Sequence, residues 1–226
     1  MIQELIAITL EIETIEKTLS IVELIKSGGF AGQLIIALLT FLLIVTLYIY
    51  FERLLTIKSA SKVDPNFMNE IKDYVVNGNF DAAKVLCMNV NSPVSRLIHK
   101  GVSRIGRPLA DINSSIENAG KLEVYSLEKN VSILATISGA APMIGFLGTV
   151  IGMILSIFEI ANSGGQIDIK LLADGLYTAM TTTVGGLVVG IIAYISYNHI
   201  VGRTNKVVYL MEANSVEFLD LLNEPT

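Results

Sequence analysis

The sequence contains no tryptophan, one cysteine and two histidines, and only 16% of its 226 residues are charged. A single cysteine, Cys87, excludes an intramolecular disulfide and a cysteine-cluster metal site, and we expect it to be a small buried thiol. Soluble domains carry about 25% charged residues, so the shortage of charge excludes a soluble globular enzyme. The net charge of −5 gives no reason to expect nucleic-acid binding.

The few charges leave three long runs without Asp, Glu, Lys or Arg, at residues 27–51, 130–158 and 175–202. An α-helix needs roughly 20 residues to cross about 30 Å of hydrocarbon, so each run is long enough to span a bilayer. The sequence therefore predicts an all-α integral membrane protein. We expect transmembrane helices over 28–51, 131–158 and 175–202.

The segments between these runs predict the orientation. Eleven of the 16 Lys and Arg residues lie between residues 52 and 129, and basic residues mark the cytoplasmic side. We therefore expect 52–130 and the tail 203–226 to be cytoplasmic, with the N-terminus and the loop 159–174 in the periplasm. Residues 1–27 have no signal-peptide pattern and instead predict an acidic amphipathic helix.

The cytoplasmic segment has helical spacing throughout. A helix is expected from Asp64-Pro65 to the break at Asn77-Gly78-Asn79, followed by short helices over 80–88 and 93–105. From Pro108 onward no obvious breaker interrupts the pattern. We therefore expect one helix of about 50 residues that leaves the cytoplasm and becomes the second span.

The second and third spans contain many small residues, unlike the first. Each has twelve Gly, Ala, Ser or Thr residues, which allow close helix packing in lipid. In both spans, polar and small residues follow steps of 4, 3, 4, 3 and 4, which place them on one helix face. The two stripes are Ser138, Pro142, Gly145, Thr149, Gly152 and Ser156, and Ala179, Thr183, Gly186, Gly190, Ala193 and Tyr197.

Two hydroxyl groups stand out within these stripes. Thr149 and Thr183 each lie roughly 14 to 15 Å from the outer end of their helix, so both should meet near the middle of the bilayer. There they could bond to water, an ion or a partner's carboxyl group. The alternative is a pair of packing seams in which each threonine bonds to a carbonyl of its own helix.

None of the three runs contains Asp, Glu, Lys or Arg. Ion-driven machines usually place an ionisable group inside the membrane, so this chain would have to obtain that group from a partner. His199 lies at the cytoplasmic end of the third span, where we favour an interfacial position over a role in proton transfer. The sequence has no nucleotide loop, Cys/His cluster or nucleophile elbow, so we expect neither an enzyme nor a cofactor or metal site.

Two segments resemble the paired signature of the MotA/TolQ/ExbB family: APMIGFLGTVIGMILSIFEIA at 141–161 and ADGLYTAMTTTVGGLVVGIIAYISYNHI at 173–200. The stretches NFDAAKVLC at 79–87 and SPVSRLI at 92–98 are similar to its ExbB/TolQ branch. Several relatives have a glutamate near the outer start of the third span, where this sequence has Thr178.

The resemblance implies a pentamer in the bacterial inner membrane, with the second and third spans around a central pore. It implies that the pore holds an ExbD- or TolR-like partner whose aspartate carries protons, and that a TonB- or TolA-like protein transmits the motion. On this basis the pore-lining residues are Thr149, Thr183, Thr178 and Thr182, and the packing residues are Pro142, Gly145, Gly148, Gly152, Gly186 and Gly190. The alternative is a self-sufficient channel or static scaffold whose stripes only pack helices.

Overall fold

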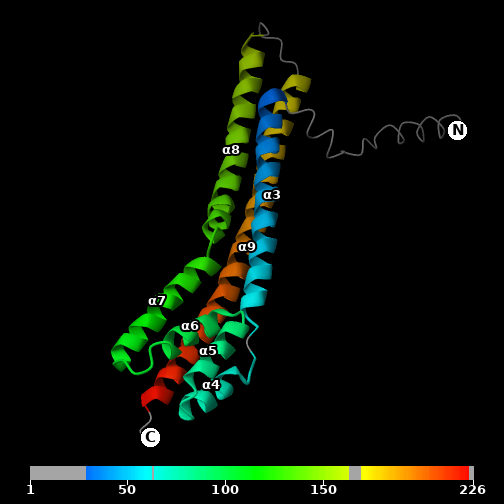
Figure 1. The fold of residues 1–226 in the computed structure, drawn as a ribbon. Coiled ribbons are helices and arrows are strands. Elements are labelled where there is room, and N and C mark those ends of the chain that lie inside the picture. The colour runs from blue at the N-terminus through cyan, green and yellow to red at the C-terminus, as the bar shows by residue number, and fades with distance from the viewer. Residues whose placement is uncertain (1–28, 63, 163–168, 224–226) are drawn as a thin grey trace, which may run out of the picture. The chain divides into compact units, whose positions relative to one another are not determined.

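A computed structural model describes residues 29–62, 64–162 and 169–223. The amphipathic helix expected over 1–27 lies outside these residues. Over the described part of the chain every regular element is an α-helix, as Figure 1 shows. The helices are α3 (Gly29–Ala60), α4 (Phe67–Val76), α5 (Phe80–Asn89), α6 (Pro93–Val102), α7 (Leu109–Leu127), α8 (Val131–Asn162) and α9 (Ile169–Asn223).

Three of these helices contain stretches that are long and apolar enough to cross a membrane: Ala31–Ala60, Val131–Asn162 and Gly175–Asn223. They cover residues 31–51, 131–158 and 175–202 of the three uncharged runs, so the all-α prediction with three spanning helices is confirmed. Many large apolar side chains on these helices are exposed in the isolated chain, including Phe41, Phe146 and Ile191. Exposure of such residues suits a lipid or protein environment better than water.

The prediction of one long helix leading into the second span was wrong. α7 ends at Leu127 and α8 begins at Val131, with Asn130 between them at a positive φ of 63°. Asparagine is one of the few residues that adopt this left-handed conformation readily. A residue in this conformation cannot be part of a right-handed helix, so α7 and α8 are separate helices. The long continuous helix is α9 instead, whose 55 residues include the third span and most of the expected tail.

The chain divides into two compact units. The first unit comprises the chain up to Leu42 together with Gly139–Gly190, and the second comprises Leu43–Ser138 together with Ile191 to the C-terminus. Each long helix therefore contributes to both units. The units are described separately below.

The second unit contains a hydrophobic core cluster of buried side chains. Ile71 of α4, Ile98 of α6 and Phe218 of α9 are fully buried in it. Gly101 allows this packing, because a Cβ atom there would lie 2.5 Å from the Phe218 ring and 2.9 Å from Ile116. The buried thiol of Cys87 belongs to the same core, and burial raises its pKa to about 12, so it is not a reactive cysteine.

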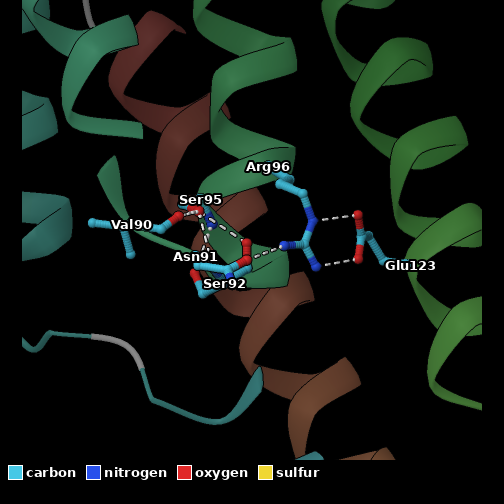
Figure 2. A network of polar contacts seen from close by, with 6 residues as sticks. All are labelled: Val90, Asn91, Ser92, Ser95, Arg96 and Glu123. Atoms are coloured by element: carbon cyan, nitrogen blue, oxygen red, sulfur yellow. Dashed lines mark hydrogen bonds and ion pairs between the residues drawn. The ribbon is translucent and has the colours of Figure 1, made fainter. Parts of the chain in front are cut away.

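A polar network fixes the start of α6, as Figure 2 shows. Ser92 and Ser95 form a capping box, in which the Ser92 hydroxyl accepts from the Ser95 N–H at 3.1 Å. Arg96 then donates two 2.6 Å hydrogen bonds to the Glu123 carboxylate on α7 and one of 3.0 Å to Asn91. Hydrogen bonding to Glu123 raises the pKa of Arg96, and this bidentate pair ties α6 to α7.

Candidate functional site

The backbones of α8 and α9 approach very closely in the first unit. A Cβ atom at Gly186 would lie 2.6 Å from the carbonyl oxygen of Ala141 and 2.8 Å from the Cα of Gly145. A Cβ atom at Gly145 would lie 2.7 Å from the carbonyl oxygen of Thr182. Only glycine fits at these two positions, so Gly145 and Gly186 pack α8 against α9.

The two threonines singled out from the sequence lie opposite each other at this contact. The Thr149 hydroxyl donates to the carbonyl oxygen of Ala179 at 3.0 Å, and the Thr183 hydroxyl donates to that of Gly145 at 3.2 Å. Their two Oγ1 atoms also form a hydrogen bond in which either can be the donor. Bonding of each hydroxyl to its own helix, the alternative considered above, is therefore not what the structure shows for this pair.

Thr182 lies deeper than the other two threonines. Its side chain is completely buried, whereas Thr149 and Thr183 are partly exposed. Its hydroxyl lies 2.8 Å from the carbonyl oxygen of Ala179 and 3.3 Å from that of Gly145. The sequence grouped Thr182 with the pore-lining residues, but the structure places it inside the helix pair.

The remaining predicted residues lie along the same helices. Thr178 is buried, and its methyl group would lie 2.8 Å from a Cβ atom at Gly32 of α3. Gly152 lies against Ala179, while Gly190 is buried in α9. Pro142 is half-buried within α8, which continues on both sides of it.

The Thr149, Thr182 and Thr183 hydroxyls, with the Ala179 and Gly145 carbonyls, form a neutral polar group, which we call the hydroxyl cluster. No Asp, Glu, Lys or Arg occurs in 139–158 or 175–190, and the described residues hold no His/Cys/Asp/Glu group suited to a metal. Hydroxyls can donate and accept hydrogen bonds but do not change charge at ordinary pH. The cluster can bind a protonatable group from elsewhere, but it cannot itself store a proton as a charge.

A second polar contact, missed by sequence reasoning, lies in the second unit. The Tyr50 hydroxyl on α3 lies 2.8 Å from Nδ1 of His199 on α9, and Arg203 donates from Nε to Nε2 of the same ring at 3.3 Å. An Arg N–H can only donate, so Nε2 accepts and the Nδ1 proton points to Tyr50. No sequence spacing relates Tyr50 to His199, because 149 residues separate them.

Three membrane-length helices and a neutral, glycine-packed hydroxyl cluster define a multi-pass helical membrane protein. Residues 89–213 match the model of the MotA/TolQ/ExbB proton channel family. This match covers more than half of the chain and includes the hydroxyl cluster. The chain therefore belongs to the MotA/TolQ/ExbB proton channel family, which is associated with channels and transport rather than with enzymes.

Individual relatives agree with this assignment. The chain is 28% identical over 185 residues to an ExbB homologue of Methanothermobacter thermautotrophicus, covering 81% of this chain and 64% of that protein. It is 37% identical over 105 residues to the biopolymer transport protein ExbB of Aquifex aeolicus, covering 45% and 70%. It is 35% identical over 85 residues to the Tol-Pal system protein TolQ of Haemophilus influenzae, covering 38% and 37%. The chain thus spans less than two thirds of the archaeal relative's length.

Proposed function

We propose that this chain is the ring-forming subunit of an inner-membrane motor that converts the proton motive force into mechanical work. The family match and the ExbB and TolQ relatives support a proton-channel type of subunit. The observation that carries the proposal is the Thr149–Thr183 pair, which joins two membrane-length helices and remains partly exposed. Each of the two hydroxyls keeps at least one lone pair that no contact within the cluster uses, so the pair can still accept a hydrogen bond from a partner.

The partner must supply the ionisable group that the spans of this chain lack. We propose an ExbD- or TolR-like protein with one transmembrane helix, whose carboxyl group takes up and releases protons beside the hydroxyl cluster. Five copies of the present chain would surround the transmembrane helices of a dimer of this partner, and a TonB- or TolA-like protein would carry the work to the outer membrane. The role would then be nutrient uptake or maintenance of the envelope.

The function requires a defined orientation in the membrane. We propose that the N-terminus and the loop 159–174 face the periplasm, and that 52–130 and the C-terminus face the cytoplasm, because Arg53 and Lys58 follow the first span closely. In intact cells making a Cys87→Ala variant, a membrane-impermeant thiol reagent should label Ser163→Cys and spare Ser114→Cys. Labelling of Ser114→Cys alone would reverse the proposed orientation.

The experiment that tests the function replaces either partly exposed threonine with valine. Thr149→Val and Thr183→Val keep the side-chain shape and remove the hydroxyl. We expect each variant to assemble in normal amounts with its partner while gradient-dependent uptake or envelope integrity falls by about tenfold, which corresponds to about 1.4 kcal/mol. Serine at either position should retain part of the activity.

Thr136→Val is the matched control, because its hydroxyl is exposed and bonds only to the Ser132 carbonyl of its own helix at 3.1 Å. This control should keep full activity. Wild-type activity in both Thr149→Val and Thr183→Val would exclude a functional role for the hydroxyl pair. That result would favour a static scaffold in which the glycine and threonine stripes only pack helices.

A further inference from the structure

The three hydroxyls of the cluster share two carbonyl oxygens. Thr149 reaches only the Ala179 oxygen, and Thr183 reaches only the Gly145 oxygen. Thr182 reaches both, at 2.8 Å and 3.3 Å. The Thr149 and Thr183 hydroxyls also bond to each other, with either as donor. Each hydroxyl has one proton, so these five contacts cannot all be made at once.

Only two arrangements place a proton between Thr149 and Thr183 and still bond both carbonyls. If Thr149 donates to Thr183, Thr183 can donate to the Gly145 oxygen, and Thr182 must then donate to the Ala179 oxygen. If Thr183 donates to Thr149, Thr149 can donate to the Ala179 oxygen, and Thr182 must then turn to the Gly145 oxygen. Every step is a hydroxyl rotation that breaks one hydrogen bond and forms another, so no proton leaves its oxygen.

We propose that Thr182 is a positioning residue whose buried hydroxyl allows the cluster to change from one arrangement to the other, which we call the reversal. In each arrangement Thr182 donates to the carbonyl oxygen that receives no hydrogen bond from Thr149 or Thr183. Without the Thr182 hydroxyl, one of the two buried carbonyl oxygens would have no hydroxyl donor in each arrangement. The proposal rests on the proposed function, since it assumes that the Thr149–Thr183 pair meets a protonatable partner.

The reversal has a consequence for the partner. In the first arrangement Thr149 accepts no bond within the cluster and has both lone pairs open, while Thr183 has one. In the second arrangement the two residues exchange these properties. The hydroxyl with more open lone pairs is therefore Thr149 on α8 in the first arrangement and Thr183 on α9 in the second. A neutral carboxyl group of the partner, which donates one hydrogen bond, can then shift its hydrogen bond from Thr149 to Thr183.

The close contact with Gly148 holds the Thr182 side chain in one position between α8 and α9. Gly148 of α8 faces this side chain, and a Cβ atom at Gly148 would overlap the Thr182 hydroxyl and lie 2.7 Å from its Cβ. The neighbouring Thr181 offers a control on the same helix. Its hydroxyl is only partly buried and bonds to the Tyr177 carbonyl of its own helix at 2.8 Å.

The test compares Thr182→Val, Thr182→Ser and Thr181→Val, expressed as full chains from the native locus together with all native partners. Valine keeps the shape and removes the donor, whereas serine keeps the donor and removes the methyl group. We expect Thr182→Val to reduce gradient-dependent activity roughly 3- to 10-fold. Thr182→Ser should retain at least half of the activity, and Thr181→Val should match the wild type.

A role in packing alone predicts the opposite order, with valine better tolerated than serine, and that order would overturn the proposal. If Thr182→Val does not assemble, Thr182→Ala replaces it, and equal activity of the alanine and serine variants would overturn the proposal as well. The Thr149→Val and Thr183→Val variants separate the two hypotheses. If these are inactive while Thr182→Val is fully active, only the present proposal fails; if all three are active, the functional role proposed for the Thr149–Thr183 pair fails as well.

Discussion

Replacing Gly186 with alanine should separate α8 from α9 in the first unit. The added methyl group would lie 2.6 Å from the Ala141 carbonyl oxygen and 2.8 Å from the Cα of Gly145. Both are backbone atoms of α8 and cannot rotate away as a side chain could. Overpacking of this kind costs about 1–3 kcal/mol, and the displaced helix would also pull Thr149 and Thr183 apart. We expect a large loss of both thermal stability and gradient-dependent activity.

Gly185→Ala is the control for this prediction. It lies next to Gly186 on the same helix, but its added Cβ would meet only the end of the Leu39 side chain, at an ordinary 3.6 Å. Alanine also favours a helix over glycine by about 1 kcal/mol. Thermal unfolding of the purified protein in detergent should therefore show a lower midpoint for Gly186→Ala and an unchanged or higher one for Gly185→Ala. Equal midpoints would contradict the close approach of the helices.

Replacing Phe218 with alanine should unfold much of the second unit. Phe218 is fully buried near the end of α9 and contacts the position where Gly101 lacks a side chain. Truncation of a buried phenylalanine costs about 3–5 kcal/mol, because it removes apolar contacts and leaves a cavity. Such a loss is a large share of the 5–15 kcal/mol that typically stabilises a domain.

Tyr209→Ala gives the matched comparison, since Tyr209 is an aromatic residue on the same helix with 69% of its surface exposed. Limited proteolysis of membrane preparations should cut α4 to α7 of Phe218→Ala rapidly and leave those of Tyr209→Ala as resistant as the wild type. Equal resistance of the two variants would show that the C-terminal part of α9 does not hold the core of this unit together.

The sequence predicted the helical class and the three spanning helices because each uncharged run is long enough to cross a bilayer as an α-helix. It also predicted that Thr149 and Thr183 meet, because both lie at about the same depth in their helices, and the structure shows a hydrogen bond between their hydroxyls. The break between α7 and α8 was missed. Asn130 gives only a weak local signal, because asparagine also occurs inside helices and its left-handed conformation is decided by what packs on either side.

The sequence by itself determined which residues are small, polar or charged, and therefore which helices suit a membrane and which faces could meet. Only the tertiary structure decided that Thr182 is buried between α8 and α9 and reaches two carbonyl oxygens. It also decided that His199 contacts Tyr50, which lies 149 residues earlier. Helical periodicity fixes the direction of a side chain on its own helix, whereas the partner that this side chain meets depends on how close the neighbouring backbone can come. Here Gly145, Gly148 and Gly186 set that distance.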